Sequence, residues 1–231
     1  MSAALSMGCA GVIGALAGTF LPATSRVAAA FARSADDAPE SEAAGANQFD
    51  GPSLWVAAVA TAGFAVACSA AFGVTWKAVF AFGFLFVLCS LAAIDHKTLL
   101  LPDVLTVPLT LGGLLVNSTG MFVSFREAAI GCSVGYMCLW SLYWAVRLVT
   151  GKEGMGFGDV KLGAALGAWL GGLALPHVLA VAAFLASAYG SFLLLRRAVP
   201  ASHFMAFGPF LAISGGLTIL VGTPLYSLLM P

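Results

Sequence analysis

The sequence predicts an all-α fold, a polytopic membrane helix bundle with about eight transmembrane helices. The first observation is composition: 61% of the 231 residues are hydrophobic and 9% are charged, with a mean hydropathy of +1.00. Soluble domains carry charge on about a quarter of their residues, so this chain lies far outside their range. The second observation is that the apolar residues fall into eight runs of roughly 20 residues, the length that crosses a bilayer as a helix. Backbone polar groups in lipid must be paired within the chain, so eight such runs indicate a helix bundle.

The apolar runs follow one another with short polar breaks, except after the first. We expect helices over 3–22, 54–74, 78–94, 104–119, 128–148, 160–175, 178–195 and 210–229. The runs that begin at 104 and 160 are short for a bilayer, so we expect structured loops to cap those helices. Three regions result: a first transmembrane helix (1–25), a short cytoplasmic linker (26–53) and a membrane-embedded domain (54–231). The linker is acidic and rich in Ala, Ser and Gly, so it is either a weakly ordered tether or an electrostatic attractor for a basic segment of a partner.

Lys and Arg are distributed unevenly around these predicted helices. If the N-terminus lies outside, eight of the ten basic residues fall on one side of the membrane, with only Lys77 and Arg126 on the other. Basic residues favour the cytoplasmic side. The predicted helix ends at Asp95 and Asp159 share that side. The formal net charge is zero and no basic stripe is present, so a nucleic-acid partner is not expected.

The cysteines do not have the spacing of a zinc site. They contain no C-x-x-C pair and are Cys9, Cys68, Cys89, Cys132 and Cys138. A tetrahedral zinc site needs four ligands, usually supplied by two closely spaced pairs. Neither a metal site nor a cofactor-binding residue is therefore expected.

Two polar segments interrupt the apolar pattern at predicted helix ends, and each carries an aspartate. Asp95 lies at the end of one apolar run and Asp159 at the start of another. An ionisable residue at such a position is costly and is a functional candidate. Peptide hydrolysis by two aspartates needs one ionised carboxylate to take a proton from water and one protonated carboxyl to donate toward the oxyanion. Two carboxylates in one site repel and share a proton, so we assign the pair jointly as catalytic, without choosing the base.

Each aspartate also has a simpler structural explanation. Asp159 has the residue type of a helix N-cap. Asp95 is harder to explain in this way, because the C-terminal end of a helix dipole disfavours an acid. We therefore expect another group to compensate the charge of Asp95.

Residues beside the two aspartates are candidates for substrate binding or for support of the pair. They are Glu153, Gly156, Gly158, Lys161, Pro102 and Asp103. The glycines allow the backbone to approach a substrate strand closely. Glu153 is either a contact for the substrate or an ordinary loop acid, and Lys161 either holds charge near the site or extends to the membrane interface. Asp103, directly after Pro102, is expected to cap a helix.

These segments resemble the type IV prepilin leader peptidases, which belong to the GxGD class of intramembrane aspartyl proteases. Residues 93–106, in which Asp95 is followed by Pro102 and Asp103, resemble the first active-site segment of that family. Residues 153–162, with Gly156-x-Gly158-Asp159, resemble the second. The stretches 18–26 and 206–212 resemble the end of the family's first helix and the start of its last.

The resemblance implies an aspartic endopeptidase at the cytoplasmic face of a bacterial inner membrane. Its substrates would be type IV prepilins or the pseudopilins of type II secretion, cut after a short basic leader, and the cleavage would need no cofactor. Larger members carry two C-x-x-C pairs between their first two spans, in a domain linked to N-methylation of the cleaved pilin by S-adenosylmethionine. The corresponding interval here contains no cysteine. The sequence thus predicts the peptidase reaction and leaves methyl transfer open.

Two other classes of protein also place carboxylates in membranes. Transporters use them, usually near the bilayer midplane, whereas these two acids lie at helix ends. A non-proteolytic scaffold of a pilus or secretion machine would tolerate the loss of both acids. The sequence indicates the lipid bilayer as a partner and does not indicate an oligomeric state.

Overall fold

The computed structural model describes residues 63–73, 75–151, 155–196 and 206–229. These residues form α-helices and one 3₁₀ turn without any strand, so the all-α prediction is confirmed for them. The predicted helix over 3–22 and the linker 26–53 lie outside the described residues. The chain divides into two compact units, Met1–Phe86 and Val87–Pro231.

The described part of the first unit consists of a helix, a sharp turn and the beginning of the next helix. The helix Gly63–Phe72 ends at Gly73, which has a φ of 67° and donates its N–H to the Ser69 carbonyl. Glycine adopts this left-handed conformation without steric cost. Helix α3 (Trp76–Thr98) then begins, and its residues from 87 onward belong to the second unit.

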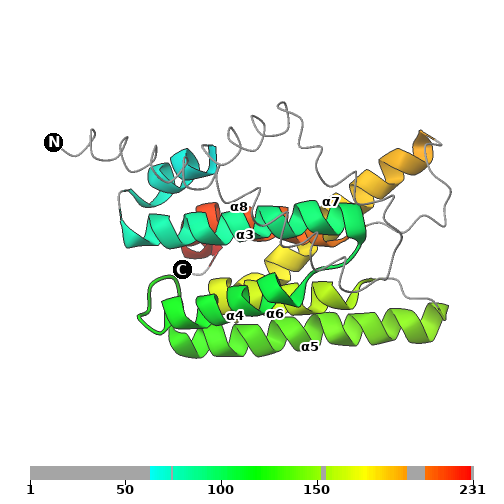
Figure 1. Cartoon of the computed structure of the whole chain (residues 1–231), viewed down its shortest axis with the longest axis horizontal. Helices are drawn as coiled ribbons and strands as arrows, with labels where there is room; N and C mark the ends of the chain where they lie inside the picture. Colours follow the sequence, from blue (N-terminus) through cyan, green and yellow to red (C-terminus); the bar gives the residue numbers. More distant parts are fainter. Residues whose placement is uncertain (1–62, 74, 152–154, 197–205, 230–231) are drawn as a thin grey trace, which may run out of the picture. The chain divides into compact units, whose positions relative to one another are not determined.

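The second unit contains the remaining helices, coloured from green to red in Figure 1. They are α4 (Asp103–Asn117), α5 (Phe125–Thr150), α6 (Phe157–Leu170), the 3₁₀ turn η2 (Gly172–Ala174), α7 (Leu175–Leu195) and α8 (Gly208–Leu229). Each of the last six predicted apolar runs overlaps one of the helices from α3 to α8. The run 160–175 is interrupted where the sequence predicted continuity. Helix α6 ends at Leu170 because Gly171 has a φ of 81° and turns the chain into η2.

Three helical segments in the described residues are long and apolar enough to cross a membrane. They are Trp76–His96, Phe125–Val149 and Gly172–Leu193. The chain is therefore a multi-pass membrane protein, as its composition predicts.

The longest helix, α5, begins at a capping box in which the Ser124 hydroxyl accepts a hydrogen bond from the Glu127 N–H and the Glu127 carboxylate accepts one from the Ser124 N–H.

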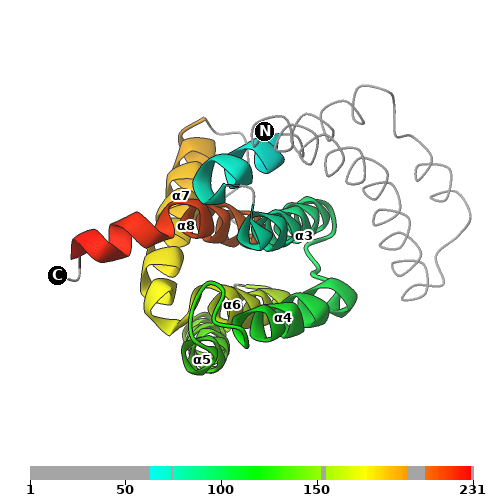
Figure 2. The same ribbon diagram turned by 90° about the vertical axis from the view of Figure 1, so that its left-hand side faces the viewer.

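Helix α6 is the centre of the second unit. It is buried from Asp159 to Trp169 except at Lys161, and it packs against α4, α5 and α8. Figure 2 shows α6 between α4 and α5, with α8 above it. A short helix surrounded in this way has few degrees of freedom, so the residues at its start are firmly positioned.

Four glycines bring the backbones of α5 and α6 into direct contact. A Cβ added at Gly131 would collide with the carbonyl oxygen of Gly167, and one added at Gly135 would collide with that of Gly163. The pairing of 131 with 167 and of 135 with 163 makes the two helices antiparallel. Small residues spaced four apart are the usual means of close helix packing in membranes.

The C-terminal end of α6 is attached to α4 by two buried side chains. The Asn117 amide donates to the carbonyls of Ala168 and Trp169, at 2.8 and 3.2 Å. The Trp169 indole donates to the Leu109 carbonyl at 2.8 Å. Carbonyls in the last turn of a helix have no partner within the helix, so the two bonds from Asn117 satisfy groups at the end of α6 that would otherwise be unpaired.

Candidate active site

Asp95 is buried at the end of α3 and bonded to the start of α8. Its side chain is 3% exposed, and its Oδ2 accepts a hydrogen bond from the Gly208 N–H at 3.0 Å. Gly208 is the first residue of α8, and the N-terminal end of a helix carries partial positive charge. The backbone of α8 thus supplies the compensating group that an acid at the end of α3 requires.

Asp159 is equally buried, at 3% exposure, in the first turn of α6. The N-cap of α6 is Gly156, so Asp159 is not the capping residue. The backbone of Gly156 and the charge of Asp95 both act electrostatically on its carboxylate. Its Oδ1 atom is buried and accepts no hydrogen bond from any residue that the structure describes. Such a carboxyl is far costlier to ionise than one with donors at both oxygens.

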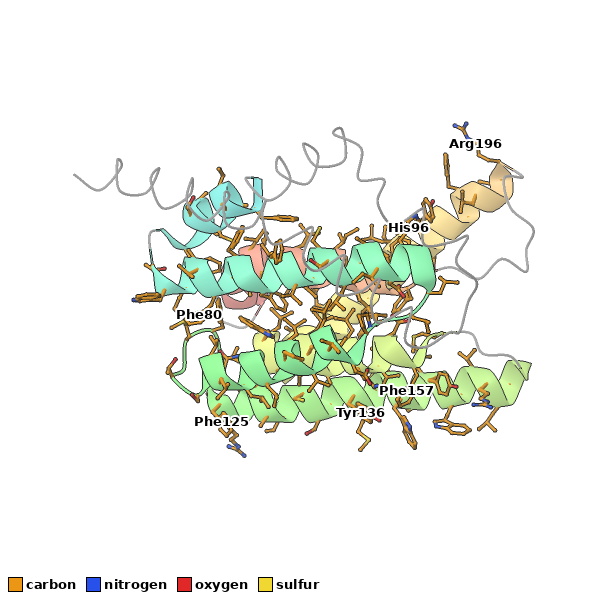
Figure 3. All side chains as sticks on the ribbon, viewed as in Figure 1. Phe80, His96, Phe125, Tyr136, Phe157 and Arg196 are labelled. Carbon is orange, nitrogen blue, oxygen red and sulfur yellow. The ribbon has the colours of Figure 1, made fainter. Side chains whose placement is uncertain are left out.

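The segment that follows Asp95 lies against the segment that precedes Asp159. A Cβ built on Gly158 would stand 2.7 Å from the Leu101 Cβ, and one built on Gly156 would stand 3.8 Å from the Leu99 carbonyl oxygen. Figure 3 shows His96, beside Asp95, and Phe157, at the start of α6, toward the same end of the second unit. The small size of Gly158 is therefore needed for packing within the chain itself, whatever its role toward a substrate.

The turn between α3 and α4 is strained at one residue. Leu99 has a φ of 55°, and its N–H donates to the Asp95 carbonyl at 2.8 Å. A helix commonly ends with a residue in this left-handed conformation, but that residue is usually glycine. For a leucine the conformation costs on the order of 1 to 2 kcal/mol. The surrounding contacts must hold this turn in place beside the two aspartates.

Lys161 and Asp103 connect the starts of α6 and α4. The Lys161 Nζ lies 2.5 Å from the Asp103 Oδ1 and 5.6 Å from the centroid of the Phe157 ring. The prediction that Asp103 caps its helix is wrong, because the N-cap is Pro102 and it makes no side-chain capping bond. A proline is favoured at the start of a helix because its missing N–H would be unpaired there anyway. Asp103 is thereby left free to bind Lys161.

Glu153, the remaining predicted site residue, lies outside the described residues. Within the described ranges, no three His, Cys, Asp or Glu side chains are grouped so that they could hold a metal ion. Gly208 was not among the predicted site residues, although two signals pointed toward it: the family-like stretch 206–212 and the need for a partner to Asp95.

The sequence also contains the spacing of a serine-hydrolase nucleophile elbow, Gly131-Cys132-Ser133-Val134-Gly135. That elbow requires a sharp turn from a strand into a helix. Here the five residues lie inside α5, and the exposed Ser133 hydroxyl donates to the Ala129 carbonyl of the same helix. The two glycines are explained by contact with α6 instead.

Fold and site together define a class of protein: a multi-pass membrane helix bundle in which two buried aspartates occupy adjoining helix ends. Residues 82–191 match the type IV leader peptidase family. The chain is also similar to proteins named prepilin leader peptidase/N-methyltransferase. It is 49% identical to the one from Aeromonas hydrophila over 162 residues, covering 70% of this chain and 56% of that protein. It is 45% identical to one from Burkholderia pseudomallei over 171 residues, covering 74% and 55%.

Residues 82–191 of the chain therefore belong to the type IV leader peptidase family, as the segments 93–106 and 153–162 predicted. It spans about half the length of the curated relatives that it matches. No solved structure matches it. Both aspartates lie within the residues that match the family, whereas Gly208 lies beyond them.

Proposed function

We propose that this chain is an aspartic endopeptidase that removes the basic leader peptide from type IV prepilins or type II secretion pseudopilins. The observation that carries the proposal is the pair of buried aspartates, Asp95 and Asp159, at two helix ends whose flanking segments lie against each other. Similarity to relatives named as prepilin leader peptidases supports the choice of substrate.

The pair has what hydrolysis of a peptide bond requires. One carboxylate takes a proton from water as the water oxygen attacks the scissile carbonyl, and the protonated partner donates to the carbonyl oxygen. Collapse of the tetrahedral intermediate passes a proton to the leaving nitrogen, which becomes the new N-terminus of the pilin. The leader leaves with a carboxyl group formed from the water oxygen. The two side chains complete the cycle without a cofactor.

Aromatic residues near Asp159 support a site at the level of the membrane interface. The Tyr143 ring lies 6.0 Å from the Phe157 ring, and the Arg147 guanidinium lies 5.4 Å from the Trp144 ring. Trp and Tyr concentrate where the bilayer meets water. A substrate helix that remains in the bilayer would present its polar end, where the leader joins, at this depth.

The distribution of Lys and Arg supports a cytoplasmic orientation of that site in a bacterial inner membrane. A basic leader held in the cytoplasm would reach the two aspartates while the apolar part of the prepilin stays in lipid. In this proposal Glu153, Gly156, Gly158, Pro102, Asp103 and Lys161 bind the substrate or support the pair. The Lys161–Asp103 contact supports the second role, because it connects the start of α6, which carries Asp159, to the start of α4, the helix after Asp95.

Methyl transfer is a separate reaction and would require S-adenosylmethionine. The proposal covers the peptidase reaction alone. The intact mass of a pilin processed by this protein reports both reactions, because cleavage and N-methylation change the mass by different amounts. A cleaved pilin without the added methyl group would limit the protein to proteolysis.

Replacement of each aspartate by asparagine tests the proposal. Purified Asp95→Asn and Asp159→Asn are expected to cleave an Aeromonas hydrophila type IV prepilin about 10²- to 10⁴-fold more slowly than the unmodified protein, the range that a positioned acid or base contributes. Glu127→Gln is a matched control, because it neutralises an exposed acid of α5 and keeps the N3 residue type of the capping box.

The outcomes separate the candidate functions. Normal cleavage by either asparagine variant would exclude the assigned pair. A transporter would be favoured if the unmodified protein carried protons into liposomes without cleaving the prepilin, and if the asparagine variants lost that proton flux. Normal pilus assembly with both acids replaced would favour a scaffold.

A further inference from the structure

We propose that Gly208 is a positioning residue: its backbone N–H holds Asp95 as the ionised partner that activates water, which leaves Asp159 as the protonated partner. This inference rests on the proposed peptidase function. It says which aspartate is the base and which is the acid, a choice that the sequence left open.

The first support is the hydrogen bond between Gly208 and Asp95. It joins the N–H of the first residue of α8 to the Asp95 Oδ2 at 3.0 Å, inside the protein. Hydrogen bonds to an ionised acceptor are stronger than neutral ones, and the positive end of a helix favours negative charge. Since Gly208 holds Oδ2, the Oδ1 atom is the one that remains to take a proton from water.

The second support is the asymmetry between the two aspartates. Asp159 has a buried Oδ1 without a hydrogen-bond donor among the described residues. A buried anionic oxygen without a donor is unfavourable, whereas a protonated carboxyl carries its own donor for a substrate carbonyl. The shared proton is therefore better accommodated on Asp159 than on Asp95.

The third support is steric and explains the residue type at position 208. A Cβ there would stand 2.5 Å from the Asp95 Oδ2 and 3.0 Å from its Cγ. Those atoms belong to the proposed catalytic carboxylate, which cannot move aside without losing its orientation. Only glycine allows the start of α8 to approach Asp95 closely enough to donate.

No charged side chain in the described ranges forms a hydrogen bond or ion pair with Asp95. Among the described residues, the charged groups that act on it electrostatically are His96, on its own helix, and Asp159, on α6. Helix α8 contains no Asp, Glu, His, Lys or Arg, so its contribution to Asp95 comes from the backbone.

The test compares two changes at position 208. Gly208→Ala keeps the N–H and displaces the carboxylate. Replacement of Gly208 by glycolic acid, introduced as an ester bond, removes the N–H and adds no atom on the side-chain side. With the Aeromonas hydrophila prepilin as substrate, we expect kcat to fall about 100-fold for the alanine variant, as for a misplaced catalytic group. The ester should lower kcat about 10- to 100-fold, as for loss of a hydrogen bond to a charged group. In both cases KM should stay within about threefold, because the bond aligns a catalytic group and does not bind substrate.

Gly215→Ala is the matched control. It adds the same methyl group to a buried position of α8, but there the nearest atoms belong to the flexible end of the Leu166 side chain. We expect its kcat to remain within about threefold of the unmodified protein. If Gly208→Ala does not accumulate in the membrane, the ester variant alone tests the inference.

A kcat within threefold of normal for the ester, or a change confined to KM, would overturn the inference. Failure of the inference is distinguishable from failure of the proposed function. If Asp95→Asn and Asp159→Asn are inactive while the ester cleaves normally, the peptidase assignment stands and only the role of Gly208 is wrong.

Discussion

Asn117→Ala is expected to be among the most destabilising single changes outside the proposed site. The side chain is fully buried and makes four hydrogen bonds. Two are donated to the carbonyls of Ala168 and Trp169, and two are accepted from the N–H groups of Phe122 and Val123, at 3.1 and 3.2 Å. One amide therefore attaches the end of α6 both to α4 and to the loop that leads into α5.

The expected loss can be worked out from these four bonds. A net contribution of about 1 kcal/mol for each buried bond, and about half of that for the two partly buried N–H groups, gives a loss of about 3 kcal/mol. The cavity left by the amide adds to this value, and water that reaches the loop N–H groups reduces it. Asn117→Asp should be at least as harmful, because it replaces the donor with a carboxylate that faces two carbonyl oxygens.

Unfolding of the purified protein by SDS in mixed micelles, followed by circular dichroism, measures this loss. Ser118→Ala is the control, since the exposed Ser118 hydroxyl bonds only to the nearby Leu115 carbonyl in the described structure. It should change stability by less than about 0.5 kcal/mol. A loss below about 1 kcal/mol for Asn117→Ala would refute the view that this amide joins the two helices.

Two further predictions concern the packing and charge of α6. Gly167→Ala should cost about 1 to 3 kcal/mol, because the added methyl group meets the backbone of Gly131, which no rotamer change relieves. Gly112→Ala, whose methyl group would meet only the edge of a ring at 3.7 Å, should be neutral or stabilising in the same unfolding assay, and equal losses for the two variants would contradict the close contact of α5 and α6. Lys161→Met should cost less than about 1 kcal/mol, because its pair with Asp103 is partly exposed. A double-mutant cycle of the two charged residues would oppose this estimate if it gave a coupling well above 1 kcal/mol.

The sequence predicted individual helices well and their ends less well. Apolar runs located α3 to α8 because burial in lipid requires a continuous stretch of apolar residues, which composition alone reveals. The positions at which helices begin and end depend on single residues. Gly171 stops α6 before the apolar run ends, and Pro102 takes the capping position expected for Asp103. Such details follow from backbone conformation, which hydropathy does not encode.

The small residues of α5 and α6 show a similar division. Their four-residue spacing is visible in the sequence, both at 131 and 135 and at 163 and 167. The spacing indicates a close helix contact, but not which helix is the partner. The same pattern at 131–135 also matches the spacing of a hydrolase motif, and only the position of those residues inside α5 separates the two interpretations.

The sequence by itself determined that this protein is an apolar helix bundle with two aspartates at helix ends, because hydrophobicity and the cost of charge in lipid are local properties of the chain. Only the tertiary structure decided what each aspartate contacts. The N–H that compensates Asp95 comes from Gly208, 113 positions along the chain, and belongs to the backbone. Every residue except proline carries that group, so the residue type at position 208 does not by itself identify the partner of Asp95. Its effect depends on the approach of α8 to the end of α3, which folding alone brings about.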